Sequence, residues 1–285
     1  MDKVRLNKFL SEMGICSRRE ADRLVEIGKV TVDGEPAVMG QKVSLAQRIV
    51  CDGKLVCGGP GDMGGIGAGG PVGGHGDSCG MGVQGQVSSQ APAGRRPAPV
   101  WLVVNKPRGV VCTTSDKDRA MNIVEMISYP RRVYPVGRLD KDSEGLILMT
   151  NQGGLMDEIL RCSHGHEREY VVRVDRPITE RFLKNMASGV ELKELGQTTR
   201  PCRAWAEGKD PRRPSDPCYT FRIVLTQGLN RQIRRMCQAL GYRVTELKRV
   251  RIMNIRLGTL RPGSYRRMTR EEYDEMCRLL GRTDR

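Results

Sequence analysis

The feature that most constrains the fold is a Gly-rich stretch of this 285-residue chain, between about residue 58 and residue 99. Glycine, serine, proline and alanine dominate it, and no apolar periodicity of a helix or a strand survives there. As a coil of about 40 residues it has a typical end-to-end distance of roughly 35 Å. The chain is therefore predicted to form two separate cores, over residues 1–57 and 100–285, joined by a flexible linker over residues 58–99.

The first core is predicted to be a small unit of two helices followed by a β-hairpin. Apolar residues at helical spacing precede Gly14, and Ser17 lies three residues before Glu20, which is the capping-box spacing at the start of a second helix. That second helix is predicted to stop at Gly28. The strands predicted after it are residues 29–32, 42–44 and 48–50, with a tight turn at residues 33–34.

Basic side chains gather around the two predicted helices, and such a surface suits contact with phosphate groups. A solvated helix face is the alternative. The strings RLNKFL from residue 5, SRREAD from residue 17 and GKVTVDG from residue 28 resemble the RNA-binding domain named after ribosomal protein S4. The basic residues of this unit that we expect to contact RNA are Arg5, Lys8, Arg18, Arg19 and Lys29.

The charge of the whole chain points to a polyanionic partner. The formal net charge is +15, which favours nucleic acid over a membrane or an acidic metabolite as the partner. Only 4% of the residues are aromatic, so phosphate contacts and RNA shape are expected to matter more than base stacking. No apolar run is long enough to cross a bilayer, and the N-terminus lacks the apolar core of a signal peptide. We expect a cytoplasmic monomer.

Neither a metal nor a nucleotide cofactor is expected. The ten cysteines have no compact spacing and are predicted to be reduced. Cys162, His164 and His166 lie close together but lack a second ligand pair. No Gly-x-Gly-x-x-Gly loop follows a strand, which argues against a dinucleotide site.

The second core is predicted to be a mixed, largely antiparallel α+β domain, because its strands and helices do not alternate regularly. Residues 105–111 are predicted as a turn into another strand. The main predicted strands are residues 100–104, 146–150, 170–174, 218–225 and 250–253, and the predicted helices are residues 179–188 and 231–240.

Residues 137–145, GRLDKDSEG, form a loop ahead of the apolar run at 146–150. A buried strand holds such a loop rigidly, so the loop is a suitable place for a catalytic carboxylate. A surface ion pair between Arg138 and Asp140 is the alternative. Residues two apart in an extended segment point the same way, so the pattern alone does not separate Asp140 from Asp142.

The helix predicted at 231–240 has two different faces. Ile233 and Met236 belong to an apolar face, whereas Arg231, Arg234 and Arg235 share the other side. These arginines suit RNA phosphate or a carboxylate that must stay ionised in a poorly solvated cleft, and an exposed helix face is the alternative.

Four segments in this order resemble the pseudouridine synthases of the RsuA/RluB/RluE/RluF group. They are NKPRG from residue 105, GRLDKDSEGL from residue 137, EREY from residue 167 and LNRQIRRM from residue 229. The strings LNRQIRR and RIMN, the latter from residue 251, most resemble the RluF branch, which acts on large-subunit ribosomal RNA. The resemblance implies isomerisation of uridine to pseudouridine in ribosomal RNA without a cofactor, and the expected target is 23S rRNA.

The resemblance also implies roles for single residues. Asp140 is implied as the ionised carboxylate that starts cleavage of the N-glycosidic bond, by attack on the sugar or by removal of a ribose proton. Tyr170 is implied to stack on the flipped uracil and to take part in proton transfer, with packing at a sheet edge as the alternative. Arg234 is implied to pair with the carboxylate, and Arg138 to fill the space of the flipped nucleotide or hold a phosphate. Lys106 is expected to contact the RNA backbone, with a simple turn residue as the alternative.

Two other functions are compatible with part of the pattern. One is an RNA-binding or ribosome-assembly factor without catalysis, against which the joint presence of Asp140, Tyr170 and Arg234 argues. The other is a synthase that acts on transfer RNA or small-subunit ribosomal RNA.

Overall fold

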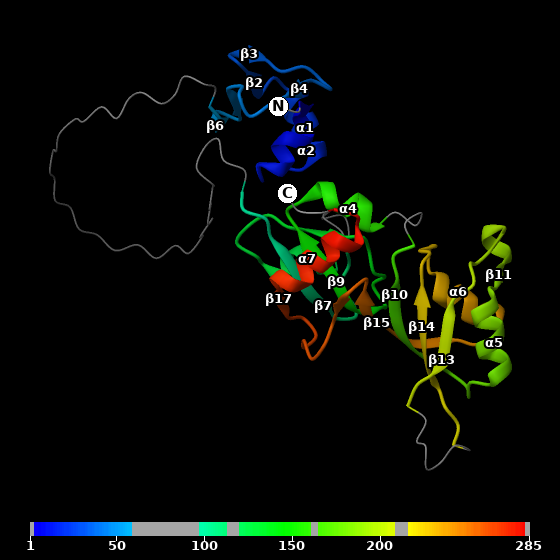
Figure 1. The fold of residues 1–285 in the computed structure, drawn as a ribbon. Helices are drawn as coiled ribbons and strands as arrows, with labels where there is room; N and C mark the ends of the chain where they lie inside the picture. Colours follow the sequence, from blue (N-terminus) through cyan, green and yellow to red (C-terminus); the bar gives the residue numbers. More distant parts are fainter. Residues whose placement is uncertain (1–2, 59–96, 113–119, 161–164, 209–215, 283–285) are drawn as a thin grey trace, which may run out of the picture. The chain divides into compact units, whose positions relative to one another are not determined.

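The computed structural model describes residues 3–58, 97–112, 120–160, 165–208 and 216–282 (Figure 1). The chain divides into two compact units, Met1–Ala98 with Pro130–Arg132 and Pro99–Tyr129 with Val133–Arg285. Nearly all of the linker predicted at 58–99 lies outside the described residues. The two units are called the N-terminal unit and the C-terminal unit.

The N-terminal unit contains the two predicted helices. Ser17 caps the second helix by accepting a hydrogen bond from the backbone N–H of Glu20, as predicted. The reciprocal bond of a capping box does not form, because the Glu20 carboxylate accepts hydrogen bonds from Arg23 instead. Phe9 and Leu10 are buried in the core. The two helices are α1 (Leu6–Glu12) and α2 (Arg18–Glu26).

The predicted hairpin of this unit is part of a larger set of strands. A four-stranded sheet has the order β3-β2-β5-β6, and a separate two-stranded sheet pairs β1 with β4. The strand expected near residue 43 therefore pairs with the chain start and not with β2, since Val4 lies opposite Val43. The strands are β1 (Val4–Arg5), β2 (Val30–Val32), β3 (Glu35–Pro36), β4 (Lys42–Val43), β5 (Ile49–Cys51) and β6 (Lys54–Cys57).

The C-terminal unit is built on a mixed sheet of nine described strands with helices packed on it. The main path of the sheet is β13-β14-β10-β15-β9-β7-β17, with β8 beside β9 and β16 beside β15. Its strands are β7 (Trp101–Lys106), β8 (Tyr134–Val136), β9 (Glu144–Thr150), β10 (Arg168–Val174), β13 (Arg203–Ala206), β14 (Thr220–Leu225), β15 (Val244–Ile252), β16 (Ile255–Arg256) and β17 (Tyr265–Arg267). The helices are α3 (Ile123–Ile127), α4 (Gly153–Leu160), α5 (Glu180–Ser188), α6 (Gln232–Ala239) and α7 (Arg270–Leu279), with a small pair of strands β11 (Glu191–Leu192) and β12 (Gln197–Thr198).

The α+β prediction is confirmed, since the described strands pair antiparallel except for the parallel pair of β15 and β9. The second strand predicted at the end of residues 105–111 is wrong. Gly109 turns the chain with a φ of 88°, and Val111 makes an isolated bridge to Asn122. The segment therefore stays a turn that approaches the loop after β8.

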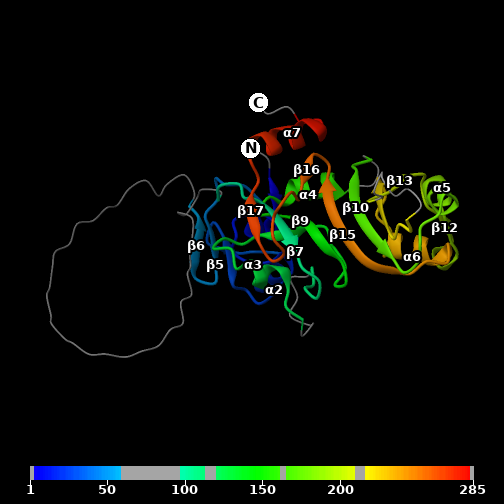
Figure 2. The same cartoon turned by 90° about the horizontal axis from the view of Figure 1, so that it is seen from below.

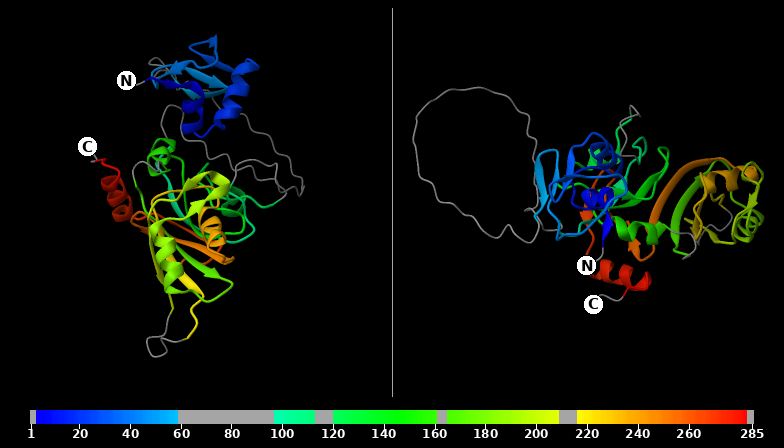
Figure 3. Two further views of the ribbon diagram at one scale, coloured as in Figure 1. Left: turned by 90° about the vertical axis from the view of Figure 1, so that its right-hand side faces the viewer. Right: turned by 90° about the horizontal axis from the view of Figure 1, so that it is seen from above.

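Apolar clusters fix the helices to the two ends of the sheet. At one end α5 and α6 pack on β10 and β14, where the rings of Phe182 and Phe221 meet edge to face at 5.3 Å. Figure 2 shows β10 and β15 curving side by side at this end, and Figure 3 shows the same end from other sides. At the other end α4 and α7 pack with alternate residues of β7 and β9, while α3 packs with the residues between them.

A glycine allows the parallel strands to meet. Gly145 lies opposite Arg249 in the pairing of β9 with β15 and has a φ of +106°. A Cβ atom at Gly145 would overlap the backbone carbonyl of Arg249 and lie 2.8 Å from its backbone nitrogen. The loop that carries Asp140 leads directly into this contact, so its position depends on the glycine.

Replacing Gly145 by alanine tests this close approach. We expect Gly145→Ala to lower the free energy of unfolding by more than about 3 kcal/mol, because both the backbone conformation and the contact oppose a side chain. Gly154→Ala is the matched control, since a Cβ there meets nothing within 4 Å, and we expect a change within about 1 kcal/mol. Urea denaturation measures both, and equal stabilities of the two variants would contradict the account.

Candidate active site

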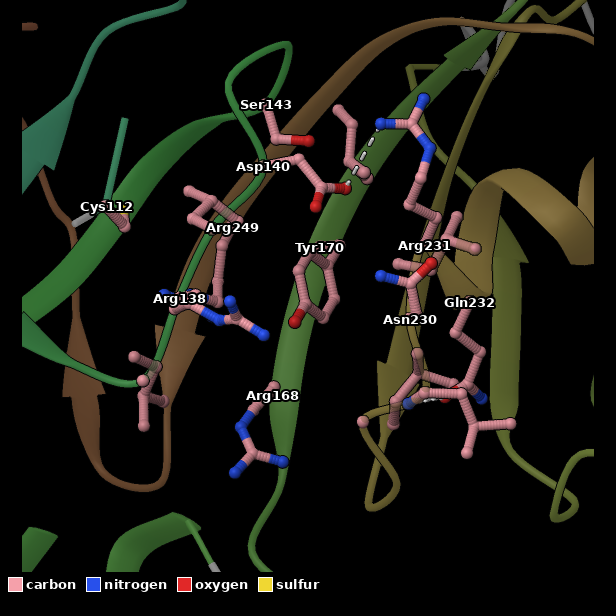
Figure 4. Close-up of a pocket in the computed structure, with 18 of the residues that line it drawn as sticks. Cys112, Arg138, Asp140, Ser143, Arg168, Tyr170, Asn230, Arg231, Gln232 and Arg249 are labelled. Carbon is pink, nitrogen blue, oxygen red and sulfur yellow. Dashed lines mark hydrogen bonds and ion pairs between the residues drawn. The ribbon is translucent and has the colours of Figure 1, made fainter. Parts of the chain in front are cut away.

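A cleft of about 900 Å³ lies in the C-terminal unit between the two helix-covered ends of the sheet (Figure 4). Leu225, Ile233 and Leu247 of one apolar cluster border it, and residues of the cluster around α4 border it from the other side. Its polar wall combines the Asp140 loop, β10, β15 and the start of α6. The charged and polar residues used below that line it are Arg138, Asp140, Arg168, Tyr170, Asn230, Arg231 and Arg249.

Basic side chains hold the loop that carries Asp140 through its backbone carbonyl groups. The carbonyl of Asp142 accepts hydrogen bonds from Arg108 Nε at 3.1 Å and from the Arg234 guanidinium at 3.1 Å. The carbonyl of Lys141 accepts from the backbone N–H of Gly109 at 2.9 Å. Because hydrogen bonds to charged donors are stronger than neutral ones, these contacts make the loop a rigid support.

Lys106 belongs to the same set of supports, and the prediction that it contacts RNA is wrong. Its side chain is fully buried, and its ammonium donates to the carbonyls of Pro107 at 2.9 Å and Val110 at 2.8 Å. Burial lowers the pKa of Lys106, and the nearby Asp140 is among the groups that oppose this shift. The lysine thus closes the turn before Gly109 and cannot reach a ligand outside.

Asp140 lies beside an arginine, but not the expected one. Arg231 Nη1 lies 3.9 Å from Asp140 Oδ2 and 3.4 Å from Asp142 Oδ2. The expected pairing of Arg234 with Asp140 is not found, because the Arg234 side chain is directed at backbone carbonyls and at Ser143 Oγ, 3.4 Å away. Burial lowers the pKa of Arg234, and the charge of Arg231 adds to this effect.

The difference arises at the start of α6. Arg231 is the residue before the helix and has a φ of 49°, a left-handed conformation that directs it away from the helix face predicted for it. Arg231 is exposed over 43% of its side chain and Asp140 over 35%, so this ion pair is open to solvent. Figure 4 shows the Arg231 guanidinium beside the Asp140 carboxylate at one end of the Tyr170 ring.

Tyr170 lies on β10 in the middle of the cleft wall, with arginines around it. Arg168 precedes it by two residues and is buried, with Nη2 bonded to the Ile159 carbonyl at 3.2 Å. Arg249 lies opposite Tyr170 on β15 and is also buried. Figure 4 shows Arg168 at the end of the ring opposite Asp140. The structure therefore brings together Asp140, Tyr170 and Arg138, of which Arg138 is exposed at the cleft.

The remaining predicted contact residues have different surroundings. Arg235 pairs with Glu194 and bonds the Asn230 carbonyl at 3.2 Å, so it faces the region of β11 and not the cleft. In the N-terminal unit, Lys8 pairs with Glu12 at 3.7 Å, and Lys29 pairs with Asp52 at 2.8 Å. The three arginines predicted to contact RNA in that unit are exposed: Arg5, Arg18 and Arg19.

An ion-pair network lies beside Tyr170 on the same strand. Glu169 accepts from Arg222 at 2.7 Å and from Arg251 at 2.8 Å, and its side chain is 9% exposed. Burial raises the pKa of Glu169, but the two arginines outweigh this effect, and its pKa lies below the ordinary value. The network ties β10 to β14 and β15 at the position of the tyrosine.

Sequence reasoning missed Arg168 and Arg249 as cleft residues. A signal existed for Arg168, because residues two apart on a strand share a face and Tyr170 was already singled out. Arg249 carried no such signal, since its place opposite Tyr170 depends on strand pairing over about 80 residues of sequence.

Within the described residues, no group of three or more potential metal ligands was found. His166 is described, but Cys162 and His164 lie outside the described residues. No described helix is long and apolar enough to cross a membrane.

The hydrogen bonds that hold the Asp140 loop can be tested by hydrogen exchange. Arg234→Gln removes the bond to the Asp142 carbonyl, and we expect the Ser143 amide, bonded to the Asp140 carbonyl at 3.0 Å, to exchange about tenfold faster. Arg231→Gln is the control, because Arg231 contacts carboxylates rather than the loop backbone. If residue-resolved exchange of both variants matches the wild type, Arg234 does not hold the loop.

The network at Glu169 predicts a pH-dependent stability. Because the pKa of Glu169 is lowered in the folded state, its contribution is complete above the unfolded value of about 4.3 and is lost as the pH falls through the folded value. We expect Glu169→Gln to cost about 2–3 kcal/mol at pH 7 and less at pH 3. Urea denaturation at both pH values checks this, with exposed Glu191→Gln as the control, and an equal loss at both pH values would count against it.

Comparisons with known proteins agree with this architecture. A family model described as RNA pseudouridylate synthase matches residues 100–239, and an S4 domain model matches residues 4–49. A solved structure of a pseudouridylate synthase is 23% identical, with a TM-score of 0.58, and the match covers 96% of this chain and 99% of that one. At this identity the match shows the fold alone.

Two curated relatives carry the comparison to the family. The dual-specificity RNA pseudouridine synthase RluF of Escherichia coli is 41% identical over 278 residues, which cover 97% of this chain and 79% of that protein. Ribosomal large subunit pseudouridine synthase B of Bacillus subtilis is 28% identical over 279 residues, which cover 96% of each protein. These matches confirm the resemblance to the RluF branch, and the chain belongs to the RNA pseudouridine synthase family.

Proposed function

We propose that this enzyme isomerises uridine in large-subunit ribosomal RNA, 23S rRNA, with Asp140 as the catalytic carboxylate. The observation that carries the proposal is that Asp140 and Tyr170 line one cleft, in which an arginine lies beside the carboxylate. A target uridine must leave its stack to react, and the cleft has the size and the aromatic surface to accept a base.

Asp140 supports the reaction through its fixed position and its charge. Hydrogen bonds hold the loop backbone directly after Asp140, while the carboxylate itself stays accessible from the cleft. Both chemical routes, attack on the sugar and removal of a ribose proton, need the ionised carboxylate. The Arg231 guanidinium lies 3.9 Å from the Asp140 carboxylate.

Tyr170 is proposed to stack on the everted base. Its ring is half-buried in the cleft wall, and Leu247 and Ile233 of the neighbouring strand and helix add apolar surface to the same cleft. Figure 4 shows Asp140 at one end of the Tyr170 ring, and we propose that the ribose of a base stacked on the ring lies on that side. The tyrosine hydroxyl is proposed to exchange a proton with the base.

RNA binding is assigned to exposed cations of both units. Arg138 and Arg231 stand at the cleft and suit phosphates next to the everted nucleotide. In the N-terminal unit, the exposed Arg5, Arg18 and Arg19 also suit RNA phosphates. Lys8 and Lys29 each form an ion pair with a carboxylate of the protein. Each pair must open before its lysine binds phosphate as strongly as an unpaired cation.

The large-subunit target is supported by the names of the relatives. The Bacillus subtilis relative is a ribosomal large subunit enzyme, whereas the Escherichia coli relative is named for dual specificity. We therefore propose large-subunit ribosomal RNA as the main substrate, with cytoplasmic location and a monomeric enzyme. The dual specificity in the name of the Escherichia coli relative makes a second RNA substrate worth testing, and transfer RNA and small-subunit ribosomal RNA are the two candidates.

Paired substitutions of the two loop aspartates test the catalytic assignment. We expect Asp140→Asn to lower the single-turnover rate of pseudouridine formation by at least about 1,000-fold while RNA affinity stays within about threefold. Asp142→Asn is the matched control, because its side chain is 56% exposed and does not line the cleft, and we expect a loss below about tenfold. Unchanged product with Asp140→Asn would remove Asp140 from the mechanism.

The same assay tests the substrate. Purified 23S, 16S and transfer RNA lacking the modification are incubated with the wild-type protein, and pseudouridine is mapped at single-nucleotide resolution. Product at a defined position of 23S RNA supports the proposal, with or without a second site in transfer RNA. Product confined to 16S or transfer RNA would overturn the proposed target.

A further inference from the structure

Arg249 is a buried cation of the cleft wall that lacks a counter-charge. Only 4% of its surface is exposed, and it forms no ion pair within the described residues. Its Nε donates to the Leu146 carbonyl at 2.7 Å, but its Nη2 is buried and has no hydrogen-bond partner among the residues described. A buried guanidinium in this state is unusual, because charged groups away from water are normally paired.

Arg249 lies next to the place proposed for the everted base. Arg249 lies directly opposite Tyr170 in the pairing of β10 and β15, and both residues line the cleft. Asp140, the acid of the cleft, has its ion pair with Arg231. A base stacked on Tyr170 would therefore lie beside a positive charge that no described carboxylate of the protein neutralises.

The reaction creates a negative charge at this place. When the bond between N1 of uracil and C1′ of ribose breaks, its electron pair leaves with the base, whether Asp140 attacks the sugar or removes a ribose proton. The charge of the departing base spreads from N1 to its O2 and O4 oxygens. When C5 then bonds to C1′, the bond between Asp140 and C1′ breaks on the first route, and the ribose regains the removed proton on the second. C5 loses a proton and N1 gains one, so the product is an isomer of the substrate.

We propose that Arg249 stabilises the negative charge of the detached uracil, which makes it a catalytic residue in addition to Asp140. This inference rests on the proposed function. A fixed donor that meets charge formed only during the reaction lowers the barrier without tightening substrate binding. The buried position of Arg249 suits this role, because a low-dielectric surrounding strengthens the interaction and the side chain is already oriented by Leu146.

The alternative is a purely structural role, in which Arg249 only ties β15 to β9 through the Leu146 carbonyl. A structural role predicts that a substitution slows the reaction of any base equally. Charge stabilisation predicts that the loss depends on how well the base carries a negative charge. 5-Fluorouridine separates the two, because its fluorine withdraws electrons and makes the departing base a more stable anion.

The experiment uses the full-length protein under single-turnover conditions, with RNA that contains uridine or 5-fluorouridine at the modified position. For Arg249→Gln we expect cleavage of the N1–C1′ bond to slow by about 100-fold or more with uridine and by less than about tenfold with 5-fluorouridine. Affinity for the RNA should stay within about threefold. Nucleoside mass spectrometry follows the loss of each starting nucleoside.

Lys248→Gln is the matched control, since it removes one positive charge from the neighbouring position, and Lys248 does not line the cleft. We expect it to stay within about threefold of the wild type with both bases. If Arg249→Gln unfolds below the assay temperature, Arg249→Lys takes its place. It keeps a charge, and its loss with uridine should again exceed its loss with 5-fluorouridine.

Equal slowing with both bases, or an Arg249→Gln rate with uridine within threefold of the wild type, would overturn the inference. Neither result would affect the proposed function as long as the wild-type protein forms pseudouridine. Failure of the wild type to form pseudouridine in any ribosomal or transfer RNA would instead overturn the proposed function, on which this inference depends.

Discussion

The site depends on backbone carbonyl groups of one loop that are held by cations from distant parts of the chain. Arg108, which follows β7, and Arg234, on α6, both donate to the carbonyl of Asp142. Lys106, on β7 itself, closes the turn that presents Arg108 and Gly109 to this loop. Because these donors lie more than 30 residues away on either side in the sequence, the Asp140 loop has its shape only when the sheet is assembled.

The basic residues around the cleft differ in burial and in the partners they contact. Buried Lys106 and half-buried Arg234 shape the loop, and exposed Arg231 lies beside the Asp140 carboxylate. Arg249 lines the cleft and forms no ion pair with the described residues. A uniformly basic surface would bind RNA but would not distinguish these roles. The separation between charges that build the site and charges that meet the substrate follows from burial and from the presence or absence of a partner.

The sequence predicted what local patterns control. The helices ending near Gly28 and beginning at Thr179 follow from caps and apolar spacing, and the strand after the Asp140 loop follows from its apolar run. The predictions from the sequence were wrong where contacts between distant segments set the position of a side chain. Arg234 was expected to pair with Asp140, but it bonds the loop backbone, and Arg231, three residues earlier and with a left-handed backbone, lies beside the carboxylate. Lys106 looked like a turn residue, and its burial arises from the meeting of two loops.

The most direct test of the central claim is a crystal structure of the Asp140→Asn variant bound to an RNA fragment that contains the target uridine. The account predicts an everted uracil stacked on Tyr170, its ribose facing residue 140, and the Asp142 carbonyl still bonded to Arg108 and Arg234. A uridine bound outside this cleft, or a residue 140 side chain turned away from the ribose into solvent, would contradict it.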